Sequence, residues 1–433
     1  MKKTYLITAL LSLVATAANA QWFRVWSGGE STRIAVTDIN TVPYSPAGQT
    51  LTFGDVNISI AEIDSITIVN PVVITWNEAT ATVAIPENVE GVTATVSGAD
   101  VVINNTNVFT EQEFILMGSS QVGSLTYNGD FKCKFHLAGL DLTSTTGGAI
   151  DIQCGKRIDL IIEDGTVNTL ADAAKGTQKA AFNCQGHLEV SGGGSLTVTG
   201  NLRHAFRTKE YLMLKKTVGN ITIAKSVGDG IHCGEYFLMN GGQLTLSGLG
   251  GDGIQVETDP GSEEVLNGQF IMNGGSIDLT MTTEDTKGIR LDIDSLNKVS
   301  PEMYLLDGVI NVNLTSTAKG SKAIASDGDL FIGSTQTEPL INITVAAETY
   351  TDPDSGEENR ATGIKADKTL TIAGGNTTIA ATGKKSRGVR AETLTAVGGT
   401  LTVTNTGSKS QGIKLDNQFV SGQGGTVNGT FKY

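Results

Sequence analysis

The chain is poor in cysteine, histidine, proline and tryptophan, and these shortages exclude several classes of protein. Among 433 residues it has four Cys, four His, eight Pro and three Trp. Four cysteines without a C-x-x-C spacing are too few for a disulfide scaffold and form no zinc motif. The formal net charge of −14 and the absence of a basic run argue against nucleic acid as a partner, because like charges repel.

The familiar signatures of catalysis and of membrane insertion are also missing. The sequence has no Gly-x-Ser-x-Gly, no His-Glu-x-x-His and no Asp-Asp pair, so serine-esterase, zincin and polygalacturonase-type hydrolysis have no support. Beyond the N-terminus, no stretch approaches the roughly 18 apolar residues of a transmembrane helix.

The N-terminus is typical of a cleaved secretory signal peptide over residues 1–20. Lys2 and Lys3 precede a short apolar run, and Ala18-Asn19-Ala20 supplies small residues before the expected cut. We therefore expect a secreted protein, located in the periplasm, at the cell surface or outside the cell. We also expect a monomer.

What is abundant is glycine, with 53 residues, in a pattern that repeats about every 24 residues. Each repeat has an apolar residue after a turn of small residues, called here the anchor, and several repeats carry a Gly pair about ten residues later. The anchors are Phe182, Phe206, Ile231, Ile254, Ile289, Ile324, Ile364, Val389 and Ile413. Alternating runs such as SLTVTG, and no helical stripe, predict about three short strands in each repeat, or rung.

Such rungs cannot bury an apolar face alone, and stacking them predicts an all-β, right-handed, single-stranded parallel β-helix, that is, an open β-solenoid. A leucine-rich repeat is the competing architecture at this period, but its signature is absent. The first part of the mature chain breaks the pattern. We expect a small N-terminal β module over residues 21–70 and the β-helix over 71–433, with entry or capping strands to about residue 116.

A resemblance to a known family covers about residues 100 to 430. The segments KAAFNCQGHLEVSGGGSLTVTG and GDGIHCGEYFLMNGGQLTLSGLGGDGI resemble the bacterial secreted carbohydrate-binding domain family, which has a pectate-lyase-like parallel β-helix and bound calcium. The resemblance implies binding of plant-type polysaccharides, including polygalacturonate (pectin), without demonstrated cleavage. ISIAEIDSITIVN resembles a β module of secreted Bacteroidetes proteins.

The doubled Gly-Asp-Gly-Ile motif predicts a metal site. Asp229 and Asp252 stand two residues before successive anchors, so their carboxylates should stack about 5 Å apart and repel unless a cation intervenes. Calcium accepts such oxygens, and the candidate ligands are Asp229, Asp252, Glu257 and Asp285. The alternative is that each Asp only hydrogen-bonds its own turn.

Basic residues beside this position predict recognition of acidic sugars. The candidate carbohydrate-binding residues are Arg203, His204, Arg207, Tyr236 and Lys287. A guanidinium can hold a sugar carboxylate directly, and calcium can bridge another. Insertions after Glu257 and Asp292 should form one wall of a groove beside Asp252.

Three cysteines align at what we expect to be one inward-facing position: Cys154, Cys184 and Cys233. Cys154 and Cys184 would lie close enough for a disulfide, although buried free thiols are the favoured interpretation.

Three functions remain open. Polysaccharide binding without catalysis is favoured. A calcium-dependent polysaccharide lyase is the alternative, with Arg203, Arg207, Lys209 or Lys287 as the base. A structural or adhesive surface protein is the third, with attachment through the N-terminal module.

Overall fold

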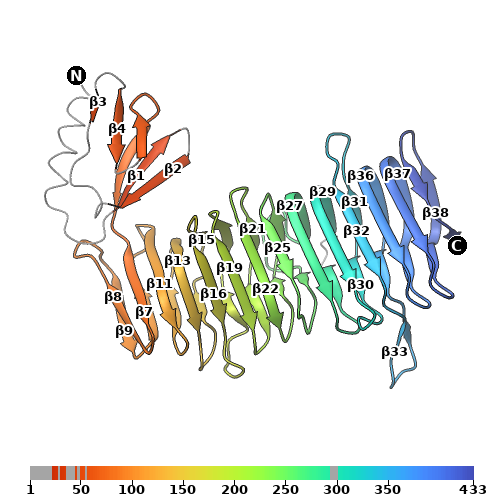
Figure 1. Ribbon diagram of the computed structural model, residues 1–433, viewed down its shortest axis with the longest axis horizontal. Coiled ribbons are helices and arrows are strands. Elements are labelled where there is room, and N and C mark those ends of the chain that lie inside the picture. Colours follow the sequence, from red (N-terminus) through yellow and green to blue (C-terminus); the bar gives the residue numbers. More distant parts are fainter. Residues whose placement is uncertain (1–21, 28–29, 36–43, 46–48, 54–55, 293–300) are drawn as a thin grey trace.

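The computed structural model describes residues 22–27, 30–35, 44–45, 49–53, 56–292 and 301–433 (Figure 1). All regular elements in these ranges are β-strands, so the all-β prediction is confirmed, and no helix that could cross a membrane is found there. The predicted signal peptide and part of the insertion after Asp292 lie outside the described residues.

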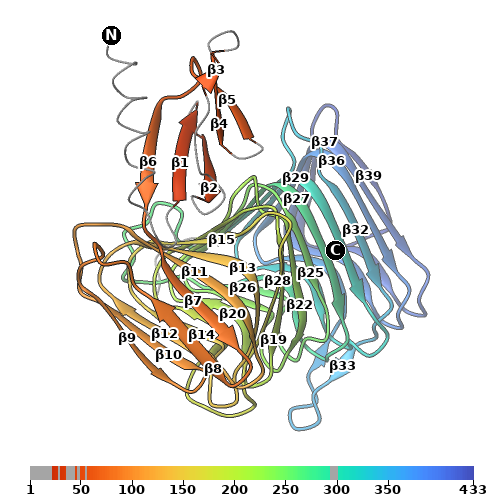
Figure 2. The same ribbon diagram turned by 60° about the vertical axis from the view of Figure 1, so that its left-hand side comes forward.

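The first six strands form two small antiparallel sheets at the end of the molecule where β7 begins (Figures 1 and 2). One sheet has the order β2-β1-β6, the other β3-β4-β5. Their bounds are β1 (Trp22–Ser27), β2 (Glu30–Ala35), β3 (Tyr44–Ser45), β4 (Thr50–Phe53), β5 (Val56–Ser59) and β6 (Ser65–Val69).

The remaining strands pair mainly in parallel and form three ladders. In each ladder, a strand of one rung pairs with the equivalent strand of the next rung. Ladder A contains β10 (Asp100–Asn105), β12 (Ser124–Gly129), β14 (Ile150–Gln153), β17 (Ala180–Cys184), β20 (His204–Thr208), β23 (Ile231–Cys233), β26 (Ile254–Val256), β28 (Lys287–Leu291), β30 (Lys322–Ser326), β35 (Thr362–Ala366) and β40 (Phe431–Lys432). Ladder B contains β7 (Val72–Asn77), β11 (Gln112–Ser120), β15 (Ile158–Ile162), β18 (Leu188–Ser191), β21 (Leu212–Leu214), β24 (Tyr236–Met239) and β31 (Asp329–Ile332). Ladder C contains β16 (Val167–Ala171), β19 (Ser195–Gly200), β22 (Asn220–Ser226), β25 (Gln243–Leu246), β32 (Leu340–Val345) and β39 (Thr426–Asn428).

Several long strands belong to more than one ladder. Strands β13 (Cys133–Thr143), β27 (Gln269–Met281), β29 (Glu302–Leu314) and β36 (Thr369–Ala381) run through ladders B and C, β38 (Gln411–Ser421) through A and B, and β37 (Arg387–Asn405) through all three. Strands β8 (Thr80–Ala84) and β9 (Val92–Ser97) pair antiparallel with β7 and β10 at the N-terminal end, and β33 (Tyr350–Thr351) and β34 (Glu358–Asn359) form a hairpin outside.

These shared strands correct the predicted open right-handed β-helix. Strands β7 to β40, without the β33–β34 hairpin, form one closed barrel of hydrogen-bonded strands, with the small sheets outside it. The sequence repeat indicates which residues stack on which, but it does not reveal whether a strand breaks at a corner. In β27 and β29 the strand passes the corner through a local register shift and continues, so separate sheets merge into one wall.

The stacking register itself agrees with the anchor pattern. Phe182 pairs with Phe206, Phe206 with Ile231 and Ile231 with Ile254, and the series continues to Ile413. All anchors are buried. The rings of Phe182 and Phe206 stack with centroids 4.6 Å apart, as expected for identical positions on neighbouring strands.

The cysteine alignment is correct for two of the three residues. Cys184, Thr208 and Cys233 share one position of ladder A, but Ile152 pairs with Cys184, so Cys154 lies two residues further along. The prediction was wrong there because the rung before Cys184 aligns through Ile150, which pairs with Phe182. All four cysteines are buried and free, so the favoured interpretation, buried thiols, is confirmed.

The second glycine of each Gly-Asp-Gly-Ile motif has a steric explanation. A Cβ on Gly253 would lie 2.3 Å from the carbonyl oxygen of Gly288 on the next rung and 2.5 Å from Leu279. A Cβ on Gly230 would lie 2.7 Å from the carbonyl oxygen of Gly253. The motif therefore lets neighbouring rungs approach closely beside the Asp.

Candidate functional site

A line of polar side chains follows the outer surface of ladder A, one residue after each anchor. We call it the polar column. Each member pairs in register with the next along the barrel. The two residues that flank Asn183 are core residues, and because successive side chains of a strand point to opposite faces, the column points away from the core. Its polar members are Asp151, Asn183, Arg207, His232, Gln255, Arg290, Lys365, Arg390 and Lys414, and Ala325 is the one apolar residue in the series.

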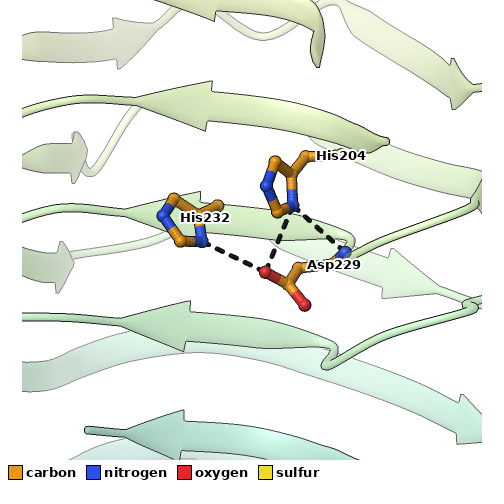
Figure 3. A group of neighbouring side chains, drawn as sticks. All are labelled: His204, Asp229 and His232. Carbon is orange, nitrogen blue, oxygen red and sulfur yellow. Dashed lines mark hydrogen bonds and ion pairs between the residues drawn. The ribbon is translucent and has the colours of Figure 1, made fainter. Parts of the chain in front are cut away.

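The predicted Asp229 lies at the centre of a buried cluster beside the column (Figure 3). Its Oδ2 atom is 3.1 Å from Nδ1 of His204 on the preceding rung and 3.1 Å from Nδ1 of His232. Its Oδ1 accepts a hydrogen bond from the amide of Asp252 at 2.9 Å. The two imidazole rings stack with centroids 4.5 Å apart.

The two histidines of this cluster differ in charge. Burial lowers the pKa of His204 despite the nearby Asp229, and its Nδ1 accepts the Asp229 amide at 3.1 Å, so His204 is neutral at pH 7. Burial would also lower the pKa of His232, but hydrogen bonds to Asp229 and Glu257 raise it to about 9. His232 is therefore the positive partner of Asp229, and its Nε2 lies 3.6 Å from Oε2 of Glu257.

Asp252 occupies the same position one rung further on, as predicted, but with other partners. Its Oδ1 accepts the amide of Lys287 at 2.7 Å, and its Oδ2 lies 3.2 Å from Nη1 of Arg290. Arg290 also holds Asp292, at 2.7 Å. Burial raises the pKa of Asp252, and the Lys287 amide and Arg290 oppose this effect. Each Asp thus accepts a hydrogen bond from a backbone amide of the following rung, whereas the alternative interpretation had each Asp bonding only to its own turn.

The predicted sugar-binding residues are spread along the ladder. Arg207 is in the column and donates from Nη1 to Oδ1 of Asn183 at 3.0 Å. Burial lowers the pKa of Arg207, and the charge of Arg203 lowers it further. Lys287 donates from Nζ to the carbonyl oxygen of Asp285 at 3.3 Å. Tyr236 lies at another corner and stacks on Tyr211, with centroids 4.6 Å apart, so it is largely buried.

The four predicted metal ligands do not converge on one point. Asp285 pairs with Lys322 at 3.4 Å, and Asp252 is held by Arg290. Around Asp229, the ligand atoms close enough to share an ion are one carboxylate oxygen and two imidazole nitrogens. Because calcium takes oxygen ligands, this donor set fits calcium poorly. Of the other predicted ligands, Glu257 reaches the cluster with its side chain, through His232, and Asp252 reaches it with its backbone amide.

The sequence reasoning missed the C-terminal half of the ladder, where a groove is strongly basic. Six basic side chains line it against three acidic ones, Glu357, Glu358 and Asp416. We call this the basic groove, and its basic residues are Lys322, Arg360, Lys365, Arg387, Arg390 and Lys414. Three of these residues directly follow an anchor, and two stand two residues before an anchor. Most of the basic groove could therefore have been predicted from the anchor pattern.

Arg387, like Arg360, has no ion-pair partner among the described carboxylates. Its Nε donates to Oε1 of Gln411 at 3.0 Å, but no carboxylate within the described ranges pairs with it. Burial, together with the charges of Arg360 and Arg390, lowers the pKa of Arg387 to about 10. Arg390 and Lys414 share Asp416, at 3.3 and 3.1 Å. The groove therefore presents excess positive charge on a chain that is acidic as a whole.

An insertion that begins at Glu348 helps to build this groove. It contains the β33–β34 hairpin, and residues Glu357 to Arg360 line one side. Lys385 pairs with Glu358, and Arg360 donates to the carbonyl oxygen of Lys385 at 3.0 Å, which fixes the hairpin to the barrel. The contribution of Arg360 could not be read from the repeat, because this insertion lies outside it.

Comparison with known proteins gives a family match over most of the chain. The model of a family described as "Carbohydrate-binding domain-containing protein" matches residues 97–412. Among solved structures, the chain is similar to a polysaccharide lyase-like protein from C. thermocellum, determined as a gadolinium derivative. The TM-score is 0.48 and the identity 21%, over 62% of this chain and 99% of that chain. No curated protein matches.

Proposed function

Because the chain belongs to the family of carbohydrate-binding domain-containing proteins, we propose that it binds an acidic polysaccharide along the polar column and the basic groove. The observation that carries this proposal is the unpaired Arg387 among neighbouring cations. A half-buried guanidinium without a carboxylate is costly in the free protein, and an anionic ligand would complete its environment.

The shape of this surface suits an extended chain of charged sugars. The column continues in register from Asp151 to Lys414, with neighbouring strands about 4.8 Å apart. Guanidinium groups of Arg207, Arg290 and Arg390 recur along it, and a guanidinium is the side chain that can hold a carboxylate through two parallel hydrogen bonds. Flat neutral chains usually need exposed aromatic rings, whereas His232 is the only ring in the column and the groove has none.

Affinity for charged and neutral polymers tests the proposal. The full chain is titrated with polygalacturonate and, as the neutral control, with dextran. We expect binding to polygalacturonate only, weakening with added salt because the contacts are between charges. The variant Arg387→Gln/Arg390→Gln should lose about 2 kcal/mol or more, since hydrogen bonds to charged groups contribute about 1.5–3 kcal/mol each.

A matched variant controls for net charge. Lys156→Gln/Lys216→Gln removes two exposed cations outside the groove and should bind like the unmodified chain. Equal losses in both double variants would mean that general charge attraction, not the groove, accounts for binding. Equal affinity for dextran would refute the choice of an acidic ligand. Ultraviolet detection of unsaturated product during the titration separates binding from the lyase alternative.

Calcium dependence remains a prediction. Titration of calcium into chelator-treated protein, with Asp229→Ala/Asp252→Ala as the comparison, tests it directly. Uptake by the unmodified chain that the variant lacks, together with stronger polymer binding, would support calcium. Polymer binding that is unchanged by chelator would leave direct charge pairing as the sole mechanism.

We also propose export to the periplasm or cell surface, on the basis of residues 1–20. Mass spectrometry of the protein from fractionated cells gives its N-terminus and location together. A mature chain that begins at Gln21 is expected. A chain retained in the cytoplasm with its first residues intact would contradict the proposal.

A further inference from the structure

A second cluster of ionisable side chains lies at the corner between ladders A and B, apart from the polar column. It consists of His187, Glu210 and Glu235, called here the corner cluster, and each residue comes just before a strand of ladder B. One ligand atom from each of the three lies within 4.8 Å of the others. Glu210 and Glu235 occupy the same position on neighbouring rungs, because Leu212 pairs with Phe237.

The corner cluster is partly buried, and one buried polar atom of each of its residues lacks a hydrogen-bond partner among the described residues. Only 4% of Glu235 is exposed, and its Oε2 has no hydrogen-bond partner among the described residues. Nδ1 of His187 and Oε2 of Glu210 are also buried without a hydrogen bond. The Oε2 of Glu210 lies 2.8 Å from Nε2 of His187, but this contact does not have hydrogen-bond alignment. Buried polar atoms are nearly always satisfied, so three together call for a missing partner.

The spacing of the unpartnered atoms suits a metal ion. Nδ1 of His187 and Oε2 of Glu235 are 4.0 Å apart, which is too far for a hydrogen bond. Two metal–ligand bonds of about 2.1 Å at a tetrahedral angle span about 3.4 Å, so a small side-chain adjustment would let one ion reach both atoms. A cation would also offset the repulsion between the stacked carboxylates, which have no Lys or Arg within 4 Å among the described residues.

From this geometry we propose that the corner cluster binds a divalent transition-metal ion of the zinc class. One imidazole nitrogen with two carboxylate oxygens is a donor set for such metals, and calcium does not favour it. Three protein ligands leave a coordination position open to water or to a ligand oxygen. This site is separate from the proposed polysaccharide surface, and its test does not depend on that function.

Stacked rings hold the imidazole in place. The ring of His187 packs on Tyr211 with centroids 4.5 Å apart, and Tyr211 packs on Tyr236 at 4.6 Å. The Tyr211 hydroxyl donates to Oε1 of Glu189 at 3.0 Å, which fixes the stack on one side. Ordered surroundings of this kind orient metal ligands before the ion binds.

Zinc titration of the chelator-treated full chain tests the proposal. Because His204, Asp229 and His232 form another possible metal cluster, the titrations use an Asp229→Asn background. We expect this protein to take up one zinc ion. Adding Glu235→Gln or Glu210→Gln should weaken zinc binding by more than the roughly 10–100-fold that loss of an outer-shell partner costs. Zinc should also raise the thermal midpoint of the background protein and not that of the variants.

Several outcomes would overturn the inference. One is no zinc uptake by the Asp229→Asn protein, and another is equal uptake with and without Glu235→Gln. Binding of calcium in preference to zinc would refute the metal class. Circular dichroism verifies folding of each variant. If Glu235→Gln fails to fold, the less buried Glu210→Gln decides, since Glu210 lies at the surface of the cluster.

Discussion

Replacement of Arg387 by methionine should make the free protein more stable and its binding to acidic polymer weaker. Burial, with Arg360 and Arg390 nearby, lowers the pKa of Arg387 from 12.5 to about 10. At about 1.36 kcal/mol per pKa unit, the charged form costs about 3 kcal/mol at neutral pH, and partial solvent contact reduces this to about 1–2 kcal/mol. Because the folded-state pKa is the lower one, the cost persists at every pH below about 10.

Thermal unfolding and polymer titration measure the two effects on the same samples. Methionine keeps the apolar stem and removes the charge, so we expect a rise in the thermal midpoint of a few °C, at about 2 °C per kcal/mol. Polygalacturonate affinity should fall about tenfold or more. Arg390→Met is the comparison, because Arg390 is more exposed and paired with Asp416 at 3.3 Å. It should weaken binding with little change in stability.

One result would refute this reasoning. If Arg387→Met lowers the midpoint while Arg390→Met does not, the bond from Arg387 to Gln411 is the important interaction and Arg387 is a structural residue. The combination of higher stability and lower affinity would instead mark Arg387 as a residue retained for binding at a cost to the fold.

Three further predictions concern the fold. Gly253→Ala should destabilise by about 1–3 kcal/mol, because its Cβ would lie 2.3 Å from the Gly288 carbonyl, whereas Gly155→Ala has nothing within 4 Å and should be near neutral; urea midpoints compare them. Burial would raise the pKa of Glu111, but Lys134, Lys132 and Arg157 hold it below 4.5. The ionised Glu111 therefore stabilises the fold above pH 4.5, and this contribution is lost as the pH falls further. Glu111→Gln should therefore reduce stability at pH 7 and flatten the acid limb of a pH-dependent unfolding series. The four buried thiols should resist maleimide in the native protein and react in denaturant, and rapid native labelling would contradict the described burial.

The repeat was the most predictable feature, because each rung must place an apolar residue inward at the same point. That requirement fixed the pairing of Ile231 with Ile254 and hence the stacking of Asp229 on Asp252. Closure of the barrel was not predictable, since it depends on whether strands such as β27 continue hydrogen bonding through a corner. The partners of each Asp were also hidden, because His232 and Arg290 follow their anchors by one residue, and the repeat does not reveal that side chains at this position contact the Asp two residues before an anchor.

The corner cluster shows how far the anchor pattern extends. His187, Tyr211 and Tyr236 each follow their anchor by five residues, and Glu210 and Glu235 each follow theirs by four. The distance of each residue from its anchor is therefore constant along the chain, and the neighbouring rings and carboxylates could have been predicted from it. The sequence does not reveal the absence of a neighbouring cation at that corner, which depends on where long side chains from other rungs reach. A structure is needed to find that these two carboxylates have no Lys or Arg within 4 Å among the described residues, and this lack is what indicates a metal.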